Sequence, residues 1–133
     1  MRPPVPIGAL VIAVYHALIG GVNLLALGLL LIAVFSSAIL VPAFLAGGVL
    51  LVLFCFGLIF FASLHLAVGV GLWRGNRAAL VGAIVLSGLL GLSGLTVFSV
   101  EGEATVGLGS ALFHGGMTLY LLLSKKVHAA FSR

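Results

Sequence analysis

The chain has 133 residues, of which 63% are hydrophobic and only 6% are charged. A soluble domain carries about 25% charged residues, so this composition cannot cover a water-exposed surface, and we expect a protein embedded in lipid. The six basic residues are too few and too scattered for a nucleic-acid surface, so we expect no nucleic-acid partner.

Two long stretches contain no charged residue, one between Arg2 and Arg74 and the other between Arg77 and Glu101. Each exceeds the roughly 20 apolar residues that cross a hydrocarbon core as a helix. The stretches are apolar on every face, whereas the strands of a transmembrane barrel alternate apolar and polar residues. The sequence therefore predicts an all-α fold of membrane-spanning helices.

The first half of the chain predicts two helices joined by a nearly apolar turn. The first helix covers about residues 5–34, and the prolines near its start are tolerated because the first N–H groups of a helix have no intrahelical partner. Ser36 and Pro42 mark the turn, which we expect to lie in the membrane interface. The second helix covers about residues 48–73, with Phe44 as an alternative start.

The second half predicts two further helices, over about residues 78–98 and 105–123. The segment between them, residues 99–105, is expected to be a loop and holds Glu101 and Glu103, the only two acidic residues. A short basic, amphipathic tail follows the last helix. We expect anchors at the membrane interface from the residues Trp73, Arg74, Arg77, Lys125 and Lys126.

Four helices place alternate loops on alternate sides, and all six basic residues then fall on one side. These residues are Arg2, Arg74, Arg77, Lys125, Lys126 and Arg133. Basic residues in short loops mark the cytoplasmic side of a membrane. We therefore predict a four-helix transmembrane bundle, a single transmembrane domain over residues 1–133, with N- and C-termini in the cytoplasm.

Three histidines, His16, His65 and His114, lie inside the predicted spans. A rise of 1.5 Å per residue places them roughly 12–15 Å from the cytoplasmic helix ends, in one layer near the midplane. Neutral imidazoles there can bond neighbouring helices, hold a haem or chlorophyll, form a three-histidine metal site, or handle protons or ions. No spacing motif supports a specific metal. We expect no metal and no cofactor, with haem or chlorophyll as the alternative.

Small residues four positions apart recur on three predicted helices and indicate close helix packing, which drives helix association in lipid. The pairs are Ala17 with Gly21, Ser87 with Gly91, and Ala111 with Gly115. His128 follows two lysines in the tail, and we expect it to face solvent or lipid headgroups. Cys55 is the only cysteine, so it forms no intrachain disulfide.

No nucleophile has a base at a recognisable spacing, and no glycine-rich phosphate loop follows a strand. Both acidic residues lie in a predicted loop, which disfavours a proton-coupled exporter. We therefore expect no catalytic residues and no enzyme. Our hypothesis is a non-catalytic accessory or scaffold subunit of a larger respiratory or photosynthetic membrane complex, with the lipid bilayer and other subunits as partners. The alternatives are a haem- or chlorophyll-binding subunit and a small homo-oligomeric channel or transporter.

Two segments carry a resemblance to a known group of proteins. Residues Gly69–Arg77 close the second predicted helix with a G-L-W-R turn, and residues Tyr120–Phe131 contain a leucine-rich end and a basic V-x-x-A-F tail. The chain resembles small uncharacterised bacterial four-helix membrane proteins. This resemblance implies a multi-pass protein of the bacterial cytoplasmic (inner) membrane and brings no catalytic residues with it.

Overall fold

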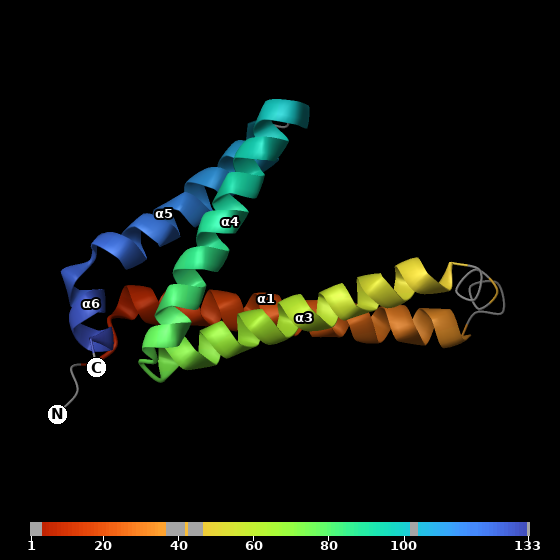
Figure 1. The fold of residues 1–133 in the computed structure, drawn as a ribbon, viewed down its shortest axis with the longest axis horizontal. Coiled ribbons are helices and arrows are strands. Elements are labelled where there is room, and N and C mark those ends of the chain that lie inside the picture. The colour runs from red at the N-terminus through yellow and green to blue at the C-terminus, as the bar shows by residue number, and fades with distance from the viewer. Residues whose placement is uncertain (1–3, 37–41, 43–46, 102–103, 133) are drawn as a thin grey trace. The chain divides into compact units, whose positions relative to one another are not determined.

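The computed structural model describes residues 4–36, 42, 47–101 and 104–132, and in these ranges the chain forms helices and no strand. The elements are α1 (Ile7–Ser36), α3 (Gly48–Trp73), α4 (Arg77–Glu101), the π-helical turn η1 (Ala104–Leu108), α5 (Gly109–Leu123) and α6 (Lys125–Phe131) (Figure 1). Four segments of this part of the chain are long and apolar enough to cross a membrane. The prediction of an all-α chain with four candidate spans is confirmed.

Helix α4 continues past the predicted end at Phe98 and reaches Glu101. The hydroxyl of Thr96 donates to the carbonyl of Leu92 at 3.1 Å. The hydroxyl of Ser99 donates to the carbonyl of Leu95 at 2.7 Å. Both side chains are thus satisfied within the helix, so Ser99, the first residue of the predicted loop, does not end it. The expected interfacial turn after α1 lies largely outside the described residues, and so does Glu103.

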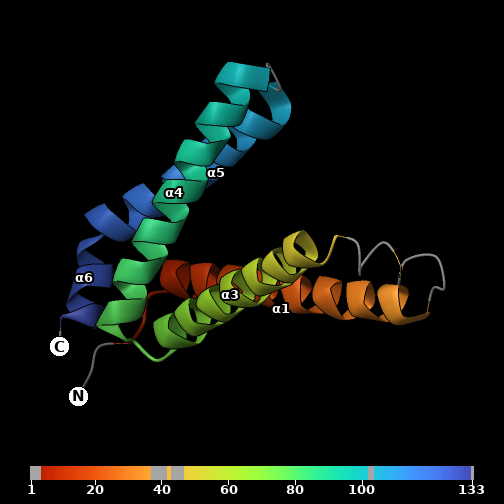
Figure 2. The same ribbon diagram turned by 45° about the vertical axis from the view of Figure 1, so that its right-hand side comes forward.

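The chain divides into two compact units, which we describe separately. The unit of residues 14–67 consists of most of α1 and most of α3. Figures 1 and 2 show these two helices side by side over part of their length. Residues on the facing sides are small or buried, including Ala62, and they allow the helices to approach closely.

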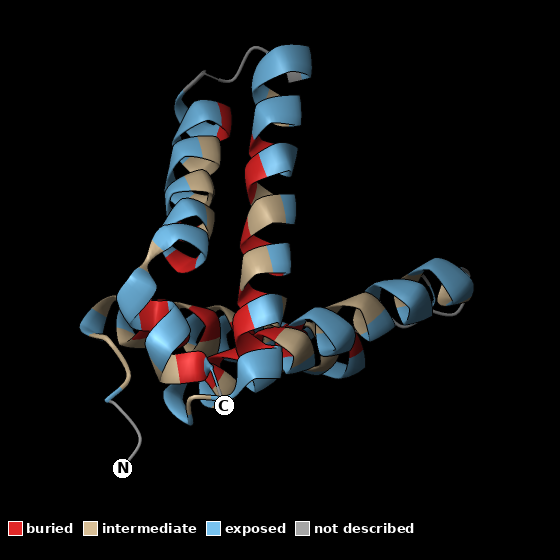
Figure 3. Cartoon of the chain, turned by 60° about the vertical axis from the view of Figure 1, so that its left-hand side comes forward, coloured by how far each residue is buried: buried red, intermediate tan, exposed pale blue. Residues whose placement is uncertain are grey.

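The other unit comprises residues 1–13 and 68–133. Its core lies where the start of α1, the end of α3, the start of α4 and the junction of α5 with α6 meet. The buried apolar side chains of this core include Ala9, Ile12, Leu72, Leu80, Leu121, Val127 and Phe131. Helices α4 and α5 run side by side, and Figure 3 shows the buried positions of α4 recurring on the side that faces α5.

The turn between α3 and α4 combines a glycine with an asparagine cap. Gly75 adopts φ +67°, a conformation that favours glycine because a Cβ would be strained there. The N–H of Asn76 donates to the carbonyl of Gly71 at 2.8 Å, which satisfies an end carbonyl of α3. The side-chain oxygen of Asn76 accepts from the N–H of Ala78 at 2.8 Å and so caps the start of α4.

Ser124 separates α5 from α6. Its backbone leaves the helical region, at φ −75° and ψ 107°, and its side-chain oxygen accepts from the N–H of Val127 at 3.4 Å. Val127 and Phe131 are four residues apart and both are buried, whereas Lys125 and Lys126 are exposed. The tail is therefore an amphipathic helix whose apolar side packs on its own unit.

Candidate functional site

A pair of buried histidines lies between α1 and α3 in the unit of residues 14–67. The Nδ1 atoms of His16 and His65 are 2.8 Å apart, and the ring centroids are 5.0 Å apart. His16 is 0% exposed and His65 is 4% exposed. The two rings therefore meet directly inside an apolar helix pair, and both are buried.

The distance between the two Nδ1 atoms is that of a hydrogen bond. A neutral imidazole has one donor and one acceptor nitrogen, so one ring donates its Nδ1–H and the other accepts. Hydrogen bonds between membrane helices contribute about 0.6 kcal/mol on average. The pair thus stabilises the contact of α1 with α3 without needing a bound group.

The same distance bears on whether the pair could hold a haem. An iron held on both faces by imidazole nitrogens, at about 2 Å each, needs those nitrogens ~4 Å apart. The Nδ1 atoms of His16 and His65 are closer than that. A haem between these rings would require the hydrogen bond to open and the helices to separate.

His114 lies on α5, in the other unit, and is half-buried. Its Nδ1 is 2.9 Å from the carbonyl oxygen of Ser110 and 3.1 Å from the hydroxyl of the same residue. The hydroxyl of Thr118 donates to the carbonyl of His114 at 2.9 Å. The polar groups that share this helix face are therefore bonded to one another along α5.

The three-histidine hypothesis also concerns metal binding. Among the residues that the structure describes, no three His, Cys, Asp or Glu side chains come together in a group that could hold a metal ion. The structure brings together His16 and His65, and it places His114 with Ser110 and Thr118.

Small residues bring α4 and α5 together. A Cβ built on Gly91 would lie 3.4 Å from the backbone N of Gly115 and 3.7 Å from the carbonyl oxygen of Ala111. Gly91, Ala111 and Gly115 all belong to the predicted pairs of small residues four positions apart, so three of these residues take part in the close approach of α4 and α5. Ser87, the partner of Gly91 in that spacing, is fully buried on the same helix.

The small-residue pair on α1 behaves differently. A Cβ on Gly21 would have nothing within 4 Å, and Gly21 is exposed. The expected contact is made by Gly20 instead, where a Cβ would lie 2.7 Å from the side chain of Leu66 and 2.9 Å from the carbonyl of Ala62. One residue turns the helix by about 100°, which is enough to point Gly20 at α3 and Gly21 away from it. The packing prediction for Gly21 is therefore wrong for this helix pair, and Ala17 is only half-buried.

The predicted anchors lie at the ends of the spans. Trp73, Arg74 and Arg77 surround the α3–α4 turn, and Lys125 and Lys126 begin α6. All five side chains are exposed.

His128 has a more specific environment than the sequence predicts. Its Nε2–H donates to the carbonyl of Leu122 at 2.7 Å, and its ring lines a cavity together with Arg77. The signal that could have found this site is the four-residue spacing of Val127 and Phe131, which folds α6 back on its unit.

Comparison with known proteins adds no relative to these observations. The chain matches no protein-family model, and neither a curated protein nor a solved structure is significantly similar to it.

Proposed function

We propose that the four candidate spans form a transmembrane bundle in a bacterial inner membrane, with both chain termini on the cytoplasmic side. One support is the grouping of elements in the unit of residues 1–13 and 68–133. A Cβ added to Gly8, near the start of α1, would overlap the ring of Tyr120 near the end of α5, so these two segments lie close together. Arg77 at the start of α4 lines the same cavity as His128 of α6. The basic residues of the turn and the tail thus gather at one end, as the positive-inside rule requires. Arg2 and Arg133 lie outside the described residues.

Within that membrane, we propose that the protein is a non-catalytic accessory or scaffold subunit of a larger respiratory or photosynthetic complex. The observation that carries this proposal is the uncovered outer side of α3. Only 11% of the most apolar stretch of α3 is buried within the chain, the lowest share among the four candidate spans, compared with 17% for the first and last spans and 39% for that of α4. Within the unit of residues 14–67, α1 leaves this side of α3 uncovered, so it is available to another transmembrane helix.

The side chains on that surface are suited to a protein partner. Val49, Leu53, Phe56 and Phe60 are exposed and recur at intervals of three and four residues, so they share one face of α3. Aromatic side chains are enriched in protein–protein interfaces. Phe56 and Phe60 are therefore the expected centre of the contact.

The polar side chains of the spans support the same function. His16 and His65 bond to each other across the α1–α3 contact, and the amide of Asn23 donates to the carbonyl of Ile19 at 3.0 Å. These bonds strengthen the helices and hold two of them together. Because these polar groups are bonded within the chain, a partner would be recognised through the apolar outer faces of the helices.

Mild detergent extraction from the native membrane, followed by native mass spectrometry, tests the proposal. We expect the chain to be recovered with at least one other membrane polypeptide. The double variant Phe56→Ala/Phe60→Ala is expected to lose that polypeptide. The matched control, Leu25→Ala/Leu29→Ala, changes two exposed α1 side chains at the same spacing and is expected to keep it.

Two outcomes would count against the subunit. Recovery only as a homo-oligomer would favour a small channel or transporter instead. Retention of the partner by the α3 variant would show that the outer side of α3 is not the contact.

A further inference from the structure

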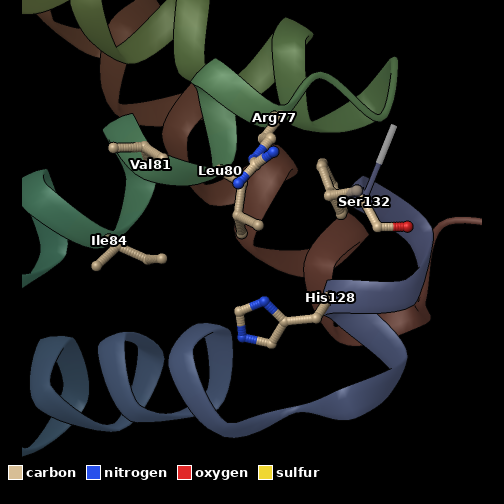
Figure 4. Close-up of a pocket in the computed structure, with 7 residues that line it drawn as sticks. Arg77, Leu80, Val81, Ile84, His128 and Ser132 are labelled. Carbon is tan, nitrogen blue, oxygen red and sulfur yellow. The ribbon is translucent and has the colours of Figure 1, made fainter.

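A cavity of about 340 Å³ lies between the first turns of α4 and helix α6, inside the unit that contains both helices. Figure 4 shows residues of α4 on one side and the ring of His128 on the other. The lining consists of Arg77, Leu80, Val81, Ile84, His128, Phe131 and Ser132.

The lining is apolar at one end and polar at the other. Leu80 and Phe131 are 5% and 1% exposed and form a fixed apolar wall. Val81 and Ile84 extend this wall along α4 into the candidate span. Arg77, by contrast, is exposed at the first position of α4. The cavity therefore has the polarity of an amphiphilic molecule that lies across the membrane interface.

The polar groups on the α6 side are held in place. The bond from Nε2 of His128 to the carbonyl of Leu122 fixes the ring against the end of α5. The hydroxyl of Ser132 donates to the carbonyl of Ala129 at 3.2 Å. Its oxygen can also accept a hydrogen bond, for example from the hydroxyl group of a ligand.

The residues that line the cavity include the cation Arg77 and no acidic residue. The only two acidic residues are Glu101 and Glu103. Glu101 ends the helix that Arg77 begins, which places the two backbone positions roughly 36 Å apart at 1.5 Å per residue. Arg74, Lys125 and Lys126 belong to the adjoining turn and to α6. The guanidinium of Arg77 has five donors and shares the cavity lining with no acidic side chain, which favours a phosphate ligand.

We propose that this cavity binds an anionic phospholipid, with the phosphate at Arg77, the polar headgroup between His128 and Ser132, and an acyl chain along Val81 and Ile84. Val81 is 55% exposed, so a chain that follows it can leave the cavity toward the bilayer. Basic pockets between helices on the cytoplasmic side of membrane proteins recognise such headgroups. This inference is independent of the accessory subunit, because it concerns α4 and α6 and needs no protein partner.

The test uses the full chain purified in detergent and native mass spectrometry. Phosphatidylglycerol is titrated against phosphatidylcholine with the same acyl chains. We expect preferential binding of phosphatidylglycerol by the unchanged protein. Arg77→Gln should weaken that binding about five-fold, the contribution of one basic residue near the membrane surface. Arg74→Gln is the matched control, because it removes the same charge from a residue outside the cavity lining, and it should bind nearly as well as the unchanged protein.

A second variant tests the apolar part of the cavity. Ile84→Phe leaves the charge unchanged and fills space along the acyl-chain path, so it should also weaken binding of phosphatidylglycerol. Unchanged binding by Ile84→Phe would overturn the proposed location. Equal losses in Arg77→Gln and Arg74→Gln would overturn it in favour of diffuse surface attraction. Binding of inorganic phosphate as tightly as phosphatidylglycerol, with the same loss in Arg77→Gln, would show a phosphate site and overturn the lipid assignment.

Discussion

The hydrogen bond between His16 and His65 matters chiefly because both rings are buried. A hydrogen bond contributes only about 1 kcal/mol net to the stability of the folded state. A buried polar group that loses its partner, however, costs about 1–3 kcal/mol. In hydrocarbon no water can replace the missing partner. The pair therefore makes correct pairing of α1 with α3 more favourable than a displaced arrangement.

The losses of stability from substituting the two histidines should be less than additive. His16→Leu or His65→Leu removes the bond and leaves one imidazole in the apolar interior, so we expect each to lower the free energy of unfolding by about 1–2 kcal/mol. The double variant His16→Leu/His65→Leu leaves neither ring, so its loss should be smaller than the sum of the single losses. The free energies of unfolding of the two single variants and of the double variant are measured by unfolding with a denaturing detergent in mixed micelles. Additive losses would contradict an energetic coupling between the rings.

The contact of α4 with α5 depends on glycines at which backbone meets backbone. A Cβ on Gly94 would lie 2.7 Å from the backbone N of Ala111 and 2.8 Å from the carbonyl oxygen of Gly107. Backbone atoms cannot move aside as a flexible side chain can. The same helix carries Gly88, where a Cβ would have nothing within 4 Å. Glycine is thus required at particular positions of α4, such as Gly94, and not at every small residue of the helix.

The two glycines give a matched test of this packing. Gly94→Ala should lower the free energy of unfolding by roughly 1–3 kcal/mol, because the helices must shift apart to admit the methyl group. Gly88→Ala should be neutral or stabilising, by up to about 1 kcal/mol, because alanine favours the helix more than glycine does. Thermal unfolding of both variants in the same detergent provides the comparison. Similar losses of unfolding free energy in the two variants would show that the packing of α4 on α5 does not require glycine at position 94.

At the scale of the whole molecule, the proposed topology follows from charge and from the number of spans. Four helices are long and apolar enough to cross a membrane, and four crossings would return the chain to the side on which it began. The start of α1, the α3–α4 turn and α6 share one unit, which brings Arg74, Arg77, Lys125 and Lys126 to one end of it. Translocation of that end would carry these basic groups across the membrane, whereas the positive-inside rule predicts that they stay in the cytoplasm.

Reporter fusions can locate each loop. Fusions after Phe35 and after Glu103 should report the outer side of the membrane, because each follows an odd number of spans. A fusion after Arg77 should report the cytoplasm and serves as the internal control. A cytoplasmic signal from the fusion after Glu103 would refute the four-span topology.

The sequence alone was enough to predict the candidate spans. Predicted and observed bounds of α3 coincide at residues 48–73, and α1 begins and ends within two residues of the predicted 5–34. The physical reason is that a helix in lipid satisfies its backbone groups within itself, so length and apolarity determine it locally. Haem or chlorophyll binding at the histidines and the accessory function both stay predictions, because spacing along a helix does not specify a ligand or a partner.

Only the tertiary structure decided which side of each helix meets its neighbour. The sequence placed His16 and His65 at similar depths, but their direct bond depends on how α1 and α3 are rotated. The same rotation selects Gly20 over Gly21 for the close approach. In a soluble helix the apolar stripe would reveal the buried side. Here the spans are apolar on all sides, so that signal is absent, and a few polar and small residues fix the rotation through contacts with the neighbouring helix.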